Sequence, residues 1–223
     1  MKLTVDILED FINSIELTGS VLSYATSGAT TTLNVAKTYH ARAFIYIDVD
    51  GTSYKVNSVV NNQSITIEGT PADPQTYTVP NPHYFHGTPI MTNSHISRAD
   101  TDQKFPMIYL YEILREKDLN PLSSIRRESD LRLFFLDTCN LEEWSTDDLY
   151  TYRLLGLNNL VDEFIEAARK YTCCFYLDDT DFERINRPNW GTFVDMKGNL
   201  AHIFDEDCTG IDLSFTLPIK CKN

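Results

Sequence analysis

Two stretches of the chain carry apolar residues at the three- and four-residue spacing that is typical of amphipathic helices. The longer stretch, residues 145–171, predicts a principal helix with one apolar stripe, made of Leu157, Leu160, Val161, Phe164, Ile165 and Ala168. Ser145 and Asp148 have the spacing of a capping box, so this helix is predicted to begin there. Gly156 lowers the helix propensity, and we expect a kink or a break at this position.

A second, shorter helix is predicted near the N-terminus, over residues 5–15. Its apolar stripe consists of Ile7, Leu8, Phe11, Ile12 and Ile15. Thr4 is its candidate N-cap, and Gly19 is the candidate end of the helix. Because a helix this short is marginal by itself, we expect its stripe to pack against the principal helix and the C-terminal sheet.

Between residues 19 and 82 the hydrophobic period changes to that of short strands separated by turns. Strands are predicted at 21–24, 31–36, 43–49, 52–56, 65–67 and 76–79. Asp50 and Gly51 form a two-residue hairpin turn of type I′, and Asn61 and Asn62 form the next turn. Five or six short strands at this spacing predict an inserted small all-β barrel or sandwich.

Further strands are predicted after residue 100, at 105–110, 131–136, 182–186 and 210–217. The order is helix, inserted β-domain, strand, strand, helix, strand, strand, which predicts an α+β fold in which helices cover a sheet. We therefore expect a core domain at 1–18 and 100–223, an inserted β-domain at 19–82, and a connector or arm at 83–99.

The connector is polar and holds His83, His86 and His95. A long loop inside a compact domain is usually functional or mobile, and we expect this one to lie on a neighbouring subunit. His83 and His86 are three positions apart and could share a metal ion, but zinc requires further ligands at defined spacing. We favour loop histidines, and no metal site is predicted.

The charge balance excludes some classes of partner. The 223 residues include 19 basic and 32 acidic side chains, which gives a formal net charge of −13. A nucleic-acid-binding surface needs clustered Lys and Arg, and an anionic membrane surface repels an acidic chain, so both are disfavoured. No run of 18 apolar residues is present, and residues 1–10 lack the apolar stretch of a signal peptide.

The cysteines do not predict a disulfide framework, because their number is odd and their spacing unpaired. They are Cys139, Cys173, Cys174, Cys208 and Cys221. We expect reduced thiols, as in a cytosolic protein. Cys139 follows a predicted strand, as a catalytic thiol could, but no histidine lies near it in the sequence, so a buried free cysteine is favoured.

Two acidic stretches have alternative interpretations. Residues 178–183 suggest a calcium loop, yet they lack the central glycine and the late glutamate of an EF-hand, so a solvated turn is favoured. Asp48 and Asp50 could serve as glycosidase carboxylates, but the hairpin turn already accounts for Asp50. The sequence contains no nucleophile elbow and no glycine-rich phosphate loop, so we predict no enzymatic activity and no cofactor.

The order of elements and three segments resemble the tail-terminator and tail-completion proteins of tailed bacteriophages. The segments are residues 105–110 (FPMIYL), 131–137 (LRLFFLD) and the closing run 203–217. In the closing run, the acidic loop of Asp205, Glu206 and Asp207 precedes the sequence TGIDL at 209–213. These features are similar to the neck or ring proteins of short-tailed phages of gut bacteria, the crAss-like group included. The inserted β-domain departs from the simplest family members.

This resemblance implies a tail-terminator-like fold and a virion structural protein, a subunit of an oligomeric ring in the head-to-tail connector that joins portal to tail. The implied partners are further copies of the chain and neighbouring portal, ring or tail proteins; DNA passes through without sequence-specific contact, and no membrane is involved. We expect the subunit contacts at His83, His86, His95, Asp205, Glu206 and Asp207.

The alternative function is a carbohydrate- or host-binding module of a phage or bacterial surface protein, in which the β-domain is the binding part. Its tyrosines could form a sugar-stacking or protein-binding face; they are Tyr24, Tyr46, Tyr54 and Tyr77. Cross-strand tyrosine pairs are the more ordinary explanation of the same residues.

Overall fold

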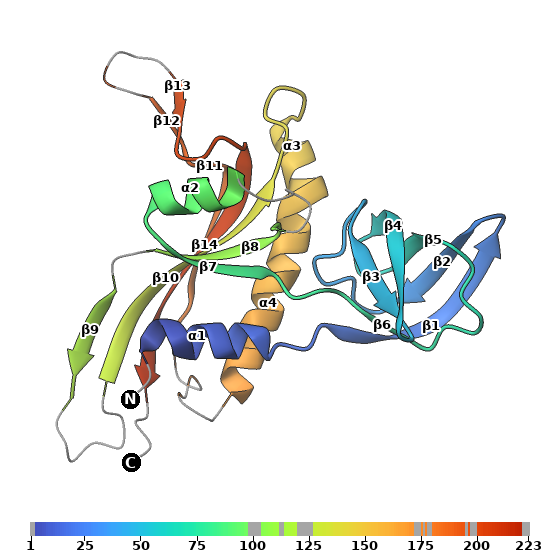
Figure 1. Ribbon diagram of the computed structural model, residues 1–223, viewed down its shortest axis with the longest axis horizontal. Helices are drawn as coiled ribbons and strands as arrows, with labels where there is room; N and C mark the ends of the chain where they lie inside the picture. The colour runs from blue at the N-terminus through green and yellow to red at the C-terminus, as the bar shows by residue number, and fades with distance from the viewer. Residues whose placement is uncertain are drawn as a thin grey trace.

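The chain folds into a closed six-stranded barrel beside a second sheet that is covered by helices (Figure 1). The computed structural model describes residues 3–97, 104–111, 114–119, 127–171, 175, 177, 180–194, 196 and 200–219. The predicted α+β class and the small inserted barrel are both confirmed.

The barrel strands are hydrogen-bonded in the order β1-β2-β5-β4-β3-β6. Their bounds are β1 Thr18–Ser27, β2 Thr30–Val35, β3 Tyr46–Val49, β4 Thr52–Val60, β5 Ser64–Glu68 and β6 Thr76–Thr78. Asp50 and Gly51, between β3 and β4, both have positive φ, +48° and +84°, which confirms the predicted type I′ turn. Alternate residues point inwards, and the barrel interior is filled by Leu33, Ile47, Val56, Ile65 and Ile67.

The second sheet has the order β11-β14-β10-β8-β7, and β9 also pairs with β10. Its strands are β7 His83–Gly87, β8 Met107–Tyr111, β9 Arg115–Asp118, β10 Arg127–Thr138, β11 Glu183–Trp190 and β14 Cys208–Ile219. A short antiparallel pair, β12 Thr192–Val194 and β13 Leu200–His202, stands apart from it. The four strands predicted after residue 100 are all present, as β8, β10, β11 and β14.

Residues 83–97 do not form the loop or arm that the sequence suggested. β7 joins the edge of the sheet parallel to β8, and α2 follows over Pro89–Ser97. Tyr84 and Phe85 pack against the apolar clusters on the two faces of the sheet, so burial holds this segment in place. The prediction failed because all five residues of β7 are only half-buried, and such an edge strand tolerates histidines that break the apolar pattern.

The principal helix is divided by an irregular turn. α3 Thr146–Leu149 leads through a π-helical turn, η2 Tyr150–Leu154, into α4 Leu155–Lys170. Ser145 Oγ accepts a hydrogen bond from the Asp148 N–H at 3.3 Å, and the Asp148 carboxylate accepts one from the Ser145 N–H at 2.9 Å, so the capping box is confirmed. The sequence predicted a kink or break at Gly156. The irregular turn is the π turn, which ends at Leu154, two residues before Gly156.

α1, Thr4–Asn13, packs with α4 and the sheet, as its apolar stripe predicted (Figure 1). The Phe11 ring lies 5.2 Å from that of Phe164 in α4, measured between centroids. The predicted helix ends were wrong. Leu3 is the N-cap, because Thr4 is buried and its hydroxyl donates to Glu116, and the helix ends before Ser14, so that Gly19 belongs to β1.

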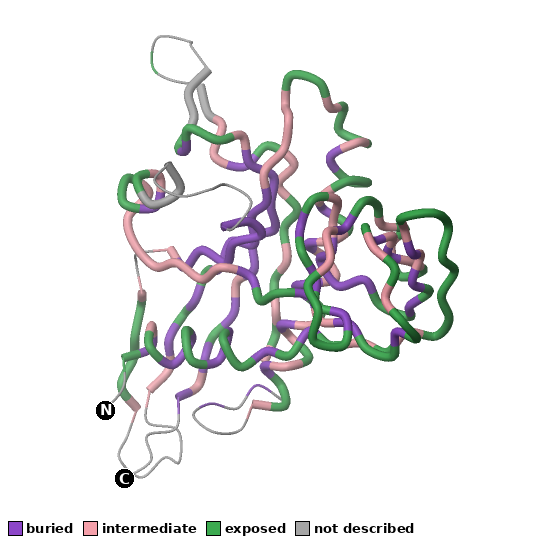
Figure 2. Tube along the Cα trace, turned by 45° about the vertical axis from the view of Figure 1, so that its right-hand side comes forward, coloured by how far each residue is buried: buried purple, intermediate pink, exposed green. Residues whose placement is uncertain are grey.

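One apolar core runs through the barrel, the two long helices and the inner face of the second sheet (Figure 2). It joins Ile47 of the barrel, Phe164 of α4 and Leu213 of β14 in a single buried cluster. A smaller cluster lies on the outer face of the sheet, made of Phe105, Met107, Tyr109, Phe134, Leu136, Trp190, Phe204 and Cys208. The barrel is therefore fixed to the core domain by shared burial.

Candidate interaction surface

The outer face of the second sheet, turned away from α1 and α4, is only partly covered by the smaller apolar cluster. Alternation along β10 and β14 places Leu133 and Leu213 in the main core, opposite each other. The intervening residues, among them Arg132 and Asp212, therefore lie on the outer face. Ile185 of β11 is paired with Asp212 and is exposed there.

Asp212 is buried in the middle of this face and accepts hydrogen bonds from two arginines. Arg132 Nε lies 3.0 Å from Asp212 Oδ1, and Arg132 Nη2 lies 2.5 Å from Oδ2. Arg187 Nε and Nη2 lie 3.2 Å and 3.1 Å from the same Oδ2. The Arg132 guanidinium also stacks on the Phe134 ring at 5.0 Å. We call Arg132 and Arg187, held by Asp212, the arginine pair.

The arginine pair presents two guanidinium groups around the buried carboxylate of Asp212, and the Glu183 carboxylate of β11 also acts on Arg132. The Arg132 and Arg187 side chains are 46% and 40% exposed, whereas Asp212 is 1% exposed. The hydrogen bond to Asp212 raises the pKa of Arg132, so this group stays cationic. A guanidinium has five N–H donors, and Asp212 engages only Nε and Nη2 of each, which leaves donors for a further acceptor.

A second ion cluster is buried where the barrel meets the second sheet. Asp137 Oδ2 lies 3.3 Å from Arg42 Nε and 3.6 Å from Arg153 Nε. Burial raises the pKa of Asp137, while the two guanidinium groups oppose this effect. Arg153 Nε also donates to the Thr138 carbonyl at 2.8 Å. All three side chains are at most 19% exposed, so this cluster fastens the barrel loop to the sheet.

His40 is buried in the same loop, two residues before Arg42. Burial lowers its pKa to about 3; nearby Arg42 adds to this shift and the Pro80 carbonyl offsets only part of it. The imidazole is therefore neutral at physiological pH. A neutral, enclosed histidine is a structural group here.

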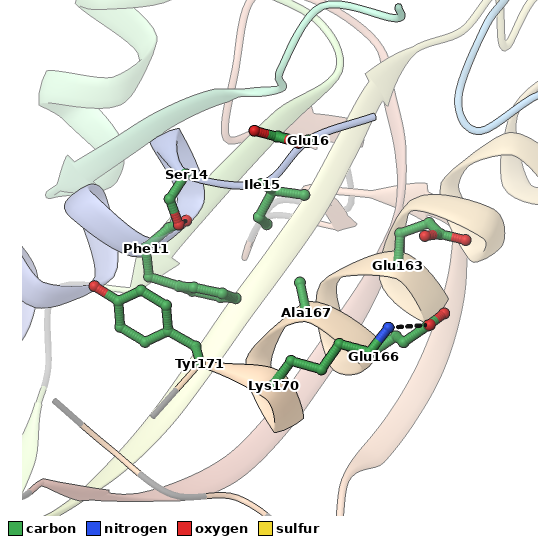
Figure 3. A pocket seen from close by; sticks show the side chains of 9 residues that line it. All are labelled: Phe11, Ser14, Ile15, Glu16, Glu163, Glu166, Ala167, Lys170 and Tyr171. Atoms are coloured by element: carbon green, nitrogen blue, oxygen red, sulfur yellow. Dashed lines mark hydrogen bonds and ion pairs between the residues drawn. The ribbon is translucent and has the colours of Figure 1, made fainter. Parts of the chain in front are cut away.

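A groove of about 420 Å³ lies between α1 and the C-terminal half of α4 (Figure 3). Its lining comprises Phe11, Ser14, Ile15, Glu16, Glu163, Glu166, Ala167, Lys170 and Tyr171. Two of its carboxylates are already in ion pairs, because Lys170 Nζ lies 2.6 Å from Glu166 and Lys37 Nζ lies 2.5 Å from Glu163. Because both carboxylates are held by lysines, these groups do not form an acid–base pair for catalysis.

The alternative catalytic residues have structural roles. Asp48 Oδ1 accepts a hydrogen bond from the Gly51 N–H at 2.7 Å. Asp50 accepts bonds from the Gln75 and Thr76 backbone, which lower the pKa of its carboxyl and make it unsuitable as a general acid. Burial raises the pKa of the Cys139 thiol to about 12, so the thiolate that a nucleophile requires does not form at neutral pH.

The residues predicted as subunit contacts lie in two regions. His83 and His86 are three apart on β7, so they occupy opposite faces of the sheet and cannot share a metal ion. His95 belongs to α2, but its side chain lies outside the described residues. Asp205 contacts α2 of the same chain. The Asp205 N–H donates a hydrogen bond to Asn93 Oδ1 at 2.9 Å, and Asn93 Nδ2 donates one to the Asp205 carboxylate at 3.1 Å.

Glu206 is exposed beside Asp205, and the Asp207 carbonyl accepts a hydrogen bond from the Cys139 N–H at 3.0 Å. A role of these histidines and acidic residues in subunit contacts stays a prediction. The proposed calcium residues Asp178 and Asp179, together with Cys173, Cys174 and Cys221, lie outside the described part of the chain.

The four tyrosines of the barrel do not form one binding face. Tyr77 is buried inside the barrel, where its ring lies 6.1 Å from that of Tyr39, and Tyr54 is half-buried. Tyr24 and Tyr46 are exposed. Tyr46 is paired with Lys55 across β3 and β4, and Lys55 Nζ lies 5.3 Å from the centroid of the exposed Phe44 ring.

Over the part of the chain that the structure describes, no group of three His, Cys, Asp or Glu side chains is placed to hold a metal ion. Among the same residues, no helix has the length and apolar character needed to cross a membrane. Comparison of the chain with protein-family models, with curated proteins and with solved structures finds no match.

Sequence reasoning missed both arginine clusters. Arg132 and Asp212 are 80 positions apart, and only the β10–β14 pairing brings them together. One signal was present at Asp212. This carboxylate lies between apolar neighbours in a strongly alternating strand, which predicts a buried charge that needs a cationic partner. Nothing in the sequence identified Arg187 as the second partner.

Proposed function

We propose that this protein is a structural subunit of an oligomeric ring in the head-to-tail connector or tail of a tailed bacteriophage, with a tail-terminator-like core domain. The observation that carries the proposal is the exposed arginine pair on the outer face of the second sheet. Arginine and aromatic side chains are enriched at protein–protein contacts, and Phe134 underlies Arg132.

The rest of the molecule supports a role in assembly. The main apolar core and the buried cluster around Asp137 join the barrel and the core domain into one body. A rigid subunit places its contact surfaces at fixed angles, and a ring closes only when those angles repeat correctly. The candidate acid, base and nucleophilic residues are occupied in structural contacts or buried in their neutral forms.

In this proposal the partners are further copies of the chain and the adjacent portal, ring or tail proteins. A net charge of −13 suits a ring through which DNA passes, because an acidic wall does not bind the duplex. Virion location and the portal-to-tail position come from the family resemblance alone.

Mass photometry of the purified protein tests the proposal. A ring-forming subunit gives a discrete species whose mass is a whole-number multiple of the subunit mass, in equilibrium with smaller forms. Catalytic turnover, or a monomer at every accessible concentration, would contradict the proposal.

A second candidate function is a carbohydrate- or host-binding module, and the barrel residues Phe44 and Tyr46 favour it. Phe44 and Tyr46 are 65% and 60% exposed, so two large aromatic residues two positions apart are available on the barrel surface. Phe44 also has φ of +73°, a conformation that is strained for a bulky residue and is found most often at functional sites.

A glycan array with Phe44→Ala and Tyr46→Ala variants separates the two functions. A binding module gives glycan signals with the wild-type monomer that both substitutions remove. A ring subunit gives no glycan signal, and both substitutions leave its assembly unchanged.

A further inference from the structure

The start of the principal helix carries exposed carboxylates and exposed apolar side chains. Its exposed carboxylates belong to Glu142, Glu143 and Asp147. Its exposed apolar side chains belong to Tyr150, Tyr152 and Leu155. We call residues 142–155 the acidic-aromatic patch.

The patch is held in one conformation before any partner binds. The Trp144 and Tyr152 rings lie 5.4 Å apart, and the Arg153 guanidinium lies 4.9 Å from the Trp144 ring. Arg153 is itself fixed by the buried Asp137. Asn140 Oδ1 accepts hydrogen bonds from the Glu142 and Glu143 N–H groups at 3.2 Å and 3.1 Å. Rigid aromatic groups bind at a low entropic cost, because little freedom is left to lose.

We propose that the acidic-aromatic patch of one subunit docks on the arginine pair of a second copy of the chain. This inference rests on the proposed ring function and names the contact that builds the ring. Carboxylates of the patch meet half-exposed guanidinium groups that keep N–H donors not used by Asp212. Tyr152, which packs on Trp144, meets the apolar part of the sheet face, where Ile185 is exposed.

A second copy is the fitting occupant, because one exposed surface of the chain carries guanidinium donors and the other carries carboxylate acceptors. The arginine pair lies on β10 and β11, whereas the patch covers the loop before α3, α3 itself, η2 and the first residue of α4. Each subunit therefore donates one surface and receives the other in a heterologous contact. Repeated head to tail, such a contact closes into a ring when the rotation per subunit divides a full turn.

A double-mutant cycle on the full chain tests this pairing. The variants are Arg187→Gln, the double substitution Glu142→Gln with Glu143→Gln, and the combination of all three. Glu68→Gln, an exposed glutamate on the barrel, is the matched control. Assembly constants are measured by sedimentation velocity at low and high salt, and circular dichroism checks folding. Arg187→Gln leaves Arg132 on Asp212, which protects the fold.

We expect each arm of the cycle to weaken assembly about tenfold, and the combination to weaken it by much less than the product of the two effects. We also expect added salt to weaken wild-type assembly, because it screens the attraction between exposed charges. Tyr152→Ala, which removes the ring packed on Trp144, also weakens assembly, whereas Glu68→Gln does not.

The outcomes separate this contact from the proposed function. A wild-type ring with strictly additive effects, or with no effect of either arm, overturns the pairing and leaves the ring function standing. A wild-type chain that stays monomeric at every concentration and salt overturns the proposed function and the pairing together.

Discussion

Asp137 and Asp212 are each buried against two arginines, and the exposure of those arginines separates their roles. Arg42 and Arg153, around Asp137, are 12% and 19% exposed, so that cluster lies inside the molecule. The arginines around Asp212 are largely exposed. A buried cluster stabilises only when all its members are present, whereas a half-exposed one can also accept a partner.

Replacing Asp137 by Asn is expected to lower the free energy of unfolding by about 3–5 kcal/mol, because two mostly buried guanidinium groups lose their counter-charge. Urea denaturation measures the change. Asp118→Asn is the control, since Asp118 is 81% exposed and its bond to Arg127 contributes less than about 1 kcal/mol. Equal effects of the two substitutions would show that the Asp137 cluster does not fasten the barrel.

His40 is expected to make stability depend on pH. The unfolded chain protonates His40 below pH 6.5, whereas the folded chain keeps it neutral down to about pH 3. Between these values the unfolded state binds more protons, so the free energy of unfolding falls as pH falls, by up to about 1.4 kcal/mol per unit.

Comparison with His40→Gln isolates this effect. Asp137, whose pKa burial raises, contributes an opposite slope in both proteins, so it cancels in the difference. If the two proteins lose stability in parallel between pH 6.5 and pH 4, His40 does not make the stability depend on pH.

At the scale of elements, α1 and α4 form the layer that covers the inner face of the second sheet. Phe164 is fully buried at its centre, with its ring 5.2 Å from Phe11, 5.4 Å from Phe135 and 6.2 Å from Phe215. Ile165, its neighbour in the predicted stripe, is only half-buried. Phe164 therefore lies at the centre of the packed layer, and Ile165 lies at its edge.

Phe164→Ala is expected to destabilise the protein by about 3–5 kcal/mol, because a large cavity opens among three aromatic rings. Ile165→Ala removes a half-buried side chain and should cost less than about 2 kcal/mol. Thermal and chemical denaturation compare the two. A smaller loss for Phe164→Ala than for Ile165→Ala would contradict the packing described for α4.

The helices and most strands were predictable because their apolar periods are strong and their turn residues are specific, as at Asp50 and Gly51. β7, β9 and α2 were missed. β9 is exposed at all four residues and β7 is half-buried throughout, so neither shows an alternating apolar pattern. Residues 83–97 therefore belong to the folded core domain, as β7 and α2, and do not form a separate arm.

At the scale of the whole molecule, the barrel and the core domain share one apolar core, so the subunit presents its surfaces in a fixed relation. The two surfaces that matter for the account, the arginine pair and the acidic-aromatic patch, could not be predicted from the sequence. The arginine pair is assembled from three strands that only tertiary pairing brings together, whereas the acidic-aromatic patch is one continuous segment whose exposure depends on the fold. The opposite charges of the arginines and of the patch carboxylates also do not show in the formal net charge of −13.

Electron microscopy of the purified protein at micromolar concentration and low salt tests the central claim most directly. The account predicts class averages of a closed ring with rotational symmetry and a central opening, built from one kind of subunit. Open filaments would show that the contact does not close, and a field of isolated monomers under these conditions would contradict the assembly function itself.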